Sequence, residues 1–171
     1  MNKASMNEEQ IKSYPLNTQW CLWYHSINDT SWDKKSYKDL YTIRDLYGLK
    51  AMNDTILPHH LQNGMFFIMR EDIFPTWEDP ENRNGSCLSF KISGSILKEQ
   101  WNYIVERILT EDILIDKNKS NCINGLSIAP KKEFNILKIW FRDYDEDYSE
   151  YIKEYSPYFQ HNRALLKKHD L

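Results

Sequence analysis

The apolar residues between Leu97 and Leu109 recur at helical spacing, and this stretch limits the possible folds more than any other. Positions three and four apart share one face of an α-helix, so the spacing predicts an amphipathic helix with one apolar stripe. The stripe consists of Leu97, Trp101, Ile104, Val105, Ile108 and Leu109. Such a helix cannot bury its stripe alone, and we expect it to pack on a sheet.

Strands are predicted on both sides of this helix. Leu88, Phe90 and Ile92 alternate with polar residues, as in a half-buried antiparallel strand. Further strands are predicted at residues 19–25, 65–69, 123–128 and 135–141, with an edge strand at 158–166. The strands at 123–128 and 135–141 are expected to form a hairpin. Because no regular βαβ alternation is visible, the sequence predicts an α+β fold with an antiparallel sheet.

The other segments complete a single domain at residues 14–171, preceded by a mobile N-terminal tail at 1–13. Thr42 is a plausible helix N-cap with Asp45 three residues later, which predicts a helix start there. Residues 27–38 and 51–63 are expected to be loops. A second helix is expected at 143–155, ended by Pro157.

Composition excludes several classes of function. A net charge of −3 argues against a broad surface for duplex nucleic acid, so any nucleic-acid contact should be a local pocket. Three widely spaced cysteines without a CxxC pair argue against a disulfide framework and a zinc site, and we expect neither metal nor cofactor. The sequence shows neither an apolar run of membrane-spanning length nor a signal peptide, so we expect a cytoplasmic or nuclear protein without a membrane partner.

The pair Trp77-Glu78 has the chemistry to read a guanine base. The indole can stack on the base, while the carboxylate accepts hydrogen bonds from guanine N1–H and the exocyclic amine. A methyl group on N7 makes the base cationic and adds a cation–π attraction of about 0.5–2 kcal/mol. Trp32 lies in a polar segment with little core to enter, which makes it the candidate for a second stacking plate. The alternative is that both tryptophans are core or interface residues.

Cations for a phosphate group are predicted near the hairpin. Lys131 and Lys132 occupy its turn and Lys138 follows on the next strand; alone, the turn lysines would be only a solvated tip. The sequence contains no phosphate-binding glycine loop and no hydrolase or metalloprotease motif. The acidic run at 143–147 is typical of a solvated helix start, and nothing local supports Cys87 with His161 as a catalytic pair. The sequence therefore favours a binding protein over an enzyme.

Taken together, these residues resemble the eukaryotic translation initiation factor 4E family of mRNA cap-binding proteins. The resemblance runs from Tyr14 to Trp140 and rests on six ordered tryptophans and on the segment 74–79, Phe-Pro-Thr-Trp-Glu-Asp. It implies one curved antiparallel sheet of about eight strands, about three α-helices on its convex face and a cap pocket on its concave face. Trp32 and Trp77 would sandwich the base, with Glu78 at the guanine edge.

The resemblance also implies roles for the remaining site residues. Lys131 falls where the family has a phosphate-binding arginine, Lys138 or Lys132 would replace a second phosphate-binding residue, and Trp140 would lie near the methyl group. Cys87 stands where the family has a basic residue. The segment after Trp140 diverges from the family, so the resemblance implies no contacts to nucleotides beyond the cap.

The family also docks a helical peptide of a scaffold protein or repressor on its convex side. The matching positions are Pro15, Leu16, Ile43 and Tyr47. Tyr47 replaces a tryptophan, and Asn102 and Glu106 replace apolar residues, which suggests a changed partner.

The sequence therefore predicts a monomeric module that binds capped mRNA and recruits a translation scaffold. Two alternatives remain: a repressor that sequesters capped RNA, and an adaptor that has lost cap binding. An enzyme acting on the cap is a weaker fourth hypothesis.

Overall fold

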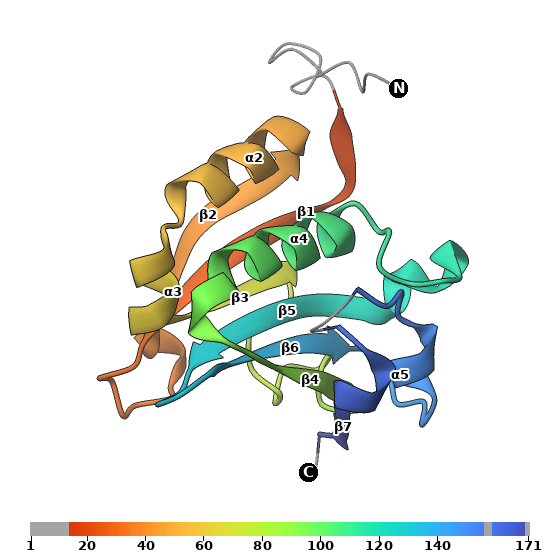
Figure 1. Cartoon of the computed structure of the whole chain (residues 1–171). Helices are drawn as coiled ribbons and strands as arrows, with labels where there is room; N and C mark the ends of the chain where they lie inside the picture. Colours follow the sequence, from red (N-terminus) through yellow and green to blue (C-terminus); the bar gives the residue numbers. More distant parts are fainter. Residues whose placement is uncertain (1–13, 156–158, 170–171) are drawn as a thin grey trace.

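One antiparallel sheet forms the frame of the molecule in the computed structural model, which describes residues 14–155 and 159–169. Its seven strands lie in the order β2-β1-β3-β5-β6-β4-β7 (Figure 1). They are β1 (Pro15–Ser26), β2 (Tyr37–Asp45), β3 (Gly64–Arg70), β4 (Ser86–Ile92), β5 (Ile123–Pro130), β6 (Asn135–Phe141) and β7 (Leu165–Lys168). The described residues therefore form seven strands rather than the expected eight. The tail at residues 1–13 and Pro157 lie outside the described residues.

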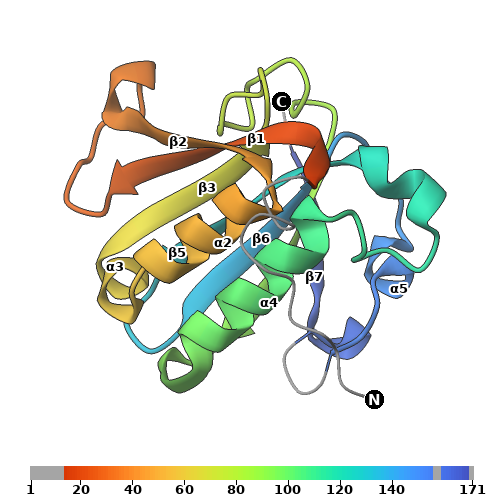
Figure 2. The same cartoon turned by 90° about the horizontal axis from the view of Figure 1, so that it is seen from above.

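Three helices cover one face of this curved sheet, as Figures 1 and 2 show. They are α2 (Leu46–Thr55), α3 (Pro58–Asn63) and α4 (Leu97–Leu109). A single-turn helix, α5 (Tyr148–Tyr151), lies at the end of the sheet near β7. The α+β fold is confirmed. We call the covered, convex side the helix face and the concave side the open face.

The helix α4 begins and ends where its apolar spacing predicts. All six residues of its stripe are at most 1% exposed, and they pack in one core with the helix-face residues of the strands. Removing this stripe from water is the main stabilisation of α4, since its capping residue Ile96 makes no side-chain hydrogen bond.

The central strands divide their side chains between the two faces. In β6, Leu137 and Ile139 join the core beneath the helices, whereas Lys138 and Trp140 point to the open face. Successive side chains of a strand alternate in direction, so a single strand supplies both the core and a surface site. The neighbouring strand β5 repeats this division, with Leu126 in the core and Ser127 on the open side.

The predicted helix start at Thr42 is wrong. Thr42 and Ile43 belong to β2, where Ile43 pairs with Trp20 of β1 and is fully buried. The N-cap is Asp45, whose carboxylate accepts a hydrogen bond from the Gly48 amide at 2.7 Å. β-branched residues fit the pleated sheet better than a first helical turn, which explains the later start.

Residues 51–63 are largely helical, not a loop. The helix α2 continues to Thr55, and α3 starts at Pro58. A proline fits the first turn of a helix, because the amide that it lacks has no partner there in any case. Proline therefore marks a helix start here, within a segment that was expected to be a loop.

The C-terminal elements are shorter than predicted. The helix expected at 143–155 is reduced to α5, and the chain then pairs at Ile152 and Tyr155 in isolated bridges. The expected edge strand exists only as β7 on β4, after a 3-10 turn at His161–Arg163. Among the described residues, no helix is long and apolar enough to cross a membrane.

Candidate functional site

A cavity of about 370 Å³ opens on the face of the sheet opposite the helices. It brings Trp32 together with Trp77, which lies 45 residues farther along the chain, and with Glu78. Its lining residues come from β2, β3, β5, β6 and two loops: Trp32, Tyr37, Met65, Phe67, Pro75, Thr76, Trp77, Glu78, Ser127, Ala129, Ile136, Lys138 and Trp140. Aromatic walls, one carboxylate and one ammonium group suit a flat polar ligand with an anionic end.

The loop that carries Trp77 is held by a fully buried amide, that of Asn82. Its Nδ2 donates to the carbonyl oxygens of Phe74 and Thr76, at 3.1 and 2.9 Å. Its Oδ1 accepts a hydrogen bond from Asn124 of β5 at 2.9 Å. These bonds join the chain before Trp77 to Asn82 after it, and Asn82 to the sheet. Trp77 itself stays 39% exposed.

Trp32 rests on His25, which is fully buried in β1. The two rings stack at a centroid distance of 4.1 Å and an angle of 4°. The imidazole nitrogens lie 2.8 Å from the Ser26 carbonyl oxygen and 2.9 Å from the Ser31 carbonyl oxygen, so His25 also holds the loop just before Trp32. This support leaves Trp32 56% exposed in a defined position.

Trp140 forms part of the floor of the cavity and is 7% exposed. Its indole N–H donates to the Ser127 hydroxyl at 3.0 Å, which fixes the ring plane. Behind it, His169 lies against the ring at a centroid distance of 5.4 Å, with Nε2 2.9 Å from the Cys87 sulfur. Burial raises the pKa of the Cys87 thiol to about 12, so the thiol stays protonated and can donate to that nitrogen.

The Glu78 carboxylate acts on the inside of the cavity. Burial raises the pKa of the Tyr37 phenol to about 12, and the negative charge of Glu78 adds to this shift. Tyr37 therefore remains a neutral hydrogen-bond donor at physiological pH. A carboxylate beside aromatic walls is suited to accept the N–H groups of a base edge.

The three predicted phosphate lysines do not share one place. Lys138 lines the cavity, whereas Lys131 and Lys132 are exposed in the turn between β5 and β6 and do not line it. The turn follows directly on Ala129, which does line the cavity. Only Lys138 is thus within the pocket itself.

The predicted docking residues lie near the start of the sheet. Pro15 and Tyr47 are exposed and Leu16 packs partly on the core, but Ile43 is fully buried, so its side chain can support a docking surface only from beneath. A groove of about 550 Å³ separates α2 from α4. Asn102 and Glu106 line it, as the departures in the sequence suggest.

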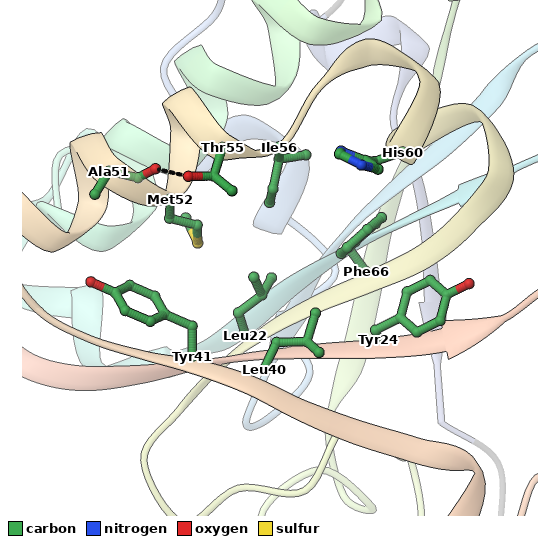
Figure 3. Close-up of a pocket in the computed structure, with 10 residues that line it drawn as sticks. All are labelled: Leu22, Tyr24, Leu40, Tyr41, Ala51, Met52, Thr55, Ile56, His60 and Phe66. Atoms are coloured by element: carbon green, nitrogen blue, oxygen red, sulfur yellow. Dashed lines mark hydrogen bonds between the residues drawn. The ribbon is translucent and has the colours of Figure 1, made fainter.

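A second, apolar cavity of about 440 Å³ lies between α2, α3 and the strands β1–β3 (Figure 3). Leu22 and Phe66 rise from the strands toward Met52 and Ile56 of α2 and its end. It is separate from the open-face cavity, because its strand residues point to the opposite side of the sheet.

The residues that support the tryptophans could not be predicted from the sequence. Asn82, Asn124 and His25 act through contacts between distant segments, and a single sequence carries no signal for such pairs. Their burial despite polar side chains is what distinguishes them. Among the described residues, no group of three His, Cys, Asp or Glu side chains could hold a metal ion.

Comparison with known proteins identifies the family. Residues 15–161 match the family model Eukaryotic initiation factor 4E. The chain belongs to the eukaryotic initiation factor 4E family. It is 28% identical over 142 residues to translation initiation factor 4E of Saccharomyces cerevisiae, covering 78% of this chain and 64% of the yeast protein. The Candida glabrata factor is 30% identical over 145 residues, with 78% and 66% covered.

A viral protein is also similar. The initiation factor 4E homolog of Acanthamoeba polyphaga mimivirus is 26% identical over 140 residues, which cover 70% of this chain and 52% of the homolog. The chain spans about two thirds of the length of the yeast relatives that it matches.

Solved structures of the family share this fold. The structure of Ascaris suum eIF4E-3 with m7G cap has a TM-score of 0.70 at 18% identity and covers 78% of this chain and 76% of that one. The complex of C. elegans eIF4E-3 with the 4E-binding protein Mextli and a cap analog gives 0.68 at 20% identity, with 76% and 75% covered. At these identities the likeness establishes the fold.

Proposed function

We propose that this chain binds the 7-methylguanosine cap of mRNA in the open-face cavity and catalyses no reaction. The observation that carries the proposal is the meeting of Trp32, Trp77 and Glu78 in one cavity. The family membership supports it, as does the cap bound to the Ascaris suum eIF4E-3 structure.

In this proposal the methylated base lies between the indoles of Trp32 and Trp77, and Glu78 accepts its N1–H and amine. The positive charge of the methylated base strengthens the stack, and each aromatic contact contributes about 1–3 kcal/mol. Trp140 lies near the methyl group. Lys138 meets the phosphates nearest the base, and the exposed Lys131 and Lys132 meet those farther out.

The protein would recruit a scaffold protein for translation initiation in the cytoplasm, as a monomer. Pro15, Leu16 and Tyr47 supply the accessible docking positions. The C. elegans eIF4E-3 structure contains the 4E-binding protein Mextli, and a schistosome eIF4E structure contains 4E-BP, which supports a protein partner for this chain.

A second candidate function is repression by sequestering capped RNA. Asn102 and Glu106 in the groove between α2 and α4 favour it, because polar side chains there weaken the docking of an apolar peptide. A translation extract depleted of its own cap-binding factor separates the two roles. Added protein restores translation of a capped reporter if it recruits a scaffold, whereas a repressor leaves translation low.

An adaptor that has lost cap binding is the third candidate function, and measurable affinity for cap analogues would contradict it.

Calorimetric titration with 7-methyl-GTP and 7-methyl-ATP tests the assigned base contacts. Glu78→Ala should lower the affinity for 7-methyl-GTP about tenfold or more and reduce the preference over the adenine analogue, because buried N–H donors lose their acceptor. Glu81→Ala is the matched control, since only the backbone of Glu81 takes part in the loop's hydrogen bonds. Unchanged selectivity in Glu78→Ala would contradict the assigned role.

A further inference from the structure

The open face carries opposite charges at its two ends, and strand register shows which side chains share it. Partners in an antiparallel pair point to the same side of a sheet. Trp140 pairs with Cys87, and Cys87 pairs with Lys167 of β7, so Lys167 lies on the same face as the floor of the cavity. Lys91 pairs with Ile136, another lining residue, and lies on this face too.

Trp140, Cys87 and Lys167 form one row across β6, β4 and β7, and a second row of paired residues lies beside it. Lys138 in the cavity pairs with Ser89, and Ser89 pairs with Leu165 on β7. The Leu165 side chain is 69% exposed, and Lys167 lies two residues farther along the same face of β7. The strip over β6, β4 and β7 therefore joins the cavity to exposed lysines and an apolar contact surface.

The opposite end of this face is acidic. Asp39 of β2 pairs with Trp23, which packs with the open-face cluster. Burial raises the pKa of the Cys21 thiol, and the carboxylates of Asp39, Glu71 and Asp72 raise it further. Lys34 is a cation on this side, with its ammonium group over the Phe74 ring at 5.3 Å. The charged groups that shift the pKa of Cys21 are nevertheless all carboxylates.

At the other end of the face, the nearby charge shifts the pKa of the Cys87 thiol in the opposite direction. The positive charge of Lys138 acts to lower its pKa, against the larger effect of burial. An anionic chain leaving the cavity therefore meets attraction toward β4 and β7 and repulsion toward β1 and β2.

We propose that the RNA following the cap runs from the cavity over β6, β4 and β7, with its backbone phosphates at Lys167 and Lys91 and a base against Leu165. This inference rests on the proposed cap binding and adds a direction to it. The contact is independent of RNA sequence, since exposed lysines on the sheet contact the phosphate backbone and not base edges. It gives a single-stranded ligand an affinity that depends on salt.

The test compares 7-methyl-GTP with a short capped oligoribonucleotide on the full chain, by fluorescence anisotropy and competition at several salt concentrations. The wild-type protein should bind the capped oligoribonucleotide more tightly, with a log–log salt slope steeper by about 0.7 for each added phosphate contact. Lys167→Glu should weaken oligoribonucleotide binding about two- to fivefold, the contribution of an exposed ion pair, and leave 7-methyl-GTP binding unchanged.

Two further variants make the direction decisive. Lys38→Glu is the matched control, because Lys38 pairs with Tyr24 and lies on the helix side of the edge strand; both affinities should stay the same. Asp39→Lys should leave 7-methyl-GTP affinity unchanged and tighten oligoribonucleotide binding less than Lys167→Glu weakens it, because Asp39 acts only from the side that the path avoids. An equal loss of affinity for both ligands in Lys167→Glu, no loss at all, or an effect of Asp39→Lys on oligoribonucleotide binding as large as that of Lys167→Glu would overturn the path. A wild-type protein that binds neither ligand would instead contradict the proposed function on which the path depends.

Discussion

Trp101 on the helix face and Trp77 on the open face show how differently the two sides of one sheet use the same side chain. Trp101 is fully buried among apolar residues of α4 and the strands. Trp77 keeps 39% of its surface exposed, and the backbone around it is held by the hydrogen bonds of a buried asparagine. Burial of the first stabilises the fold. Exposure of the second retains apolar surface for a ligand to cover.

The contacts of the open-face tryptophans explain how an aromatic site stays accessible. On the open face, Trp32 is supported by stacking on His25, and Trp140 by a hydrogen bond to Ser127. Each ring is fixed through one face or its polar edge, so the rest of its surface is free to bind. Substitutions on the helix face should therefore reduce stability, and those on the open face should reduce binding.

The largest expected effect is that of Trp101→Ala. Emptying this site in the core should lower the free energy of unfolding by about 3–5 kcal/mol, measured by urea denaturation. The open-face counterpart, Trp77→Ala, should cost about 1 kcal/mol or less of stability while lowering cap affinity by about 1–3 kcal/mol. Equal stability losses in the two variants would contradict the division between the faces.

An intermediate effect is expected for Asn82→Ala, which should affect both stability and binding. The substitution leaves the carbonyl oxygens of Phe74 and Thr76 without their donor and should cost about 1–3 kcal/mol in stability. Because the same bonds hold the Trp77 loop, affinity for 7-methyl-GTP should fall as well. Asn84→Ala, an exposed position in the same loop, is the control and should change neither quantity. A stability loss without any loss of affinity would show that the loop need not be held for binding.

The smallest expected effect is the pH dependence of the pairing of β7 with β4. Burial lowers the pKa of His169 below its usual value, and the charge of Lys138 lowers it further, whereas the Asn82 carbonyl and Glu78 oppose the shift. When β7 is detached from β4, the pKa of the His169 imidazole returns to its usual value of about 6.5. As the pH falls through this value, the detached state therefore takes up a proton before the packed state does, and detachment of β7 becomes more favourable. The change should be below about 1 kcal/mol.

Hydrogen exchange of the β7 amides measures this attachment. Exchange should accelerate between neutral pH and pH values below about 6.5, after correction for the intrinsic pH dependence of exchange. In His169→Gln, whose side chain does not titrate, the corrected rates should not change with pH in this range. The same acceleration in His169→Gln would assign the effect to other groups.

The sequence predicted the elements whose signals are local. The helix α4 and the strand β6 have the predicted bounds, because apolar periodicity alone determines them. The predicted start of α2 was wrong. Ile43 pairs with Trp20 and so extends β2 past that point, and such a pairing between distant segments leaves no local signal in the sequence. For the same reason the meeting of Trp32 with Trp77 was expected from resemblance, whereas the supports His25 and Asn82 could not be found. The roles of all the named cap-site residues, the lysines included, remain predictions.

The most direct test of cap binding in the open-face cavity is quenching of tryptophan fluorescence by 7-methyl-GTP, with unmethylated GTP as the control. Stacking between Trp32 and Trp77 predicts strong, saturable quenching that depends on the methyl group, because the cationic base gains the cation–π attraction. In Trp32→Leu or Trp77→Leu, both the quenching and the affinity should fall. Equal and weak quenching by the two nucleotides in the wild-type protein would contradict the account.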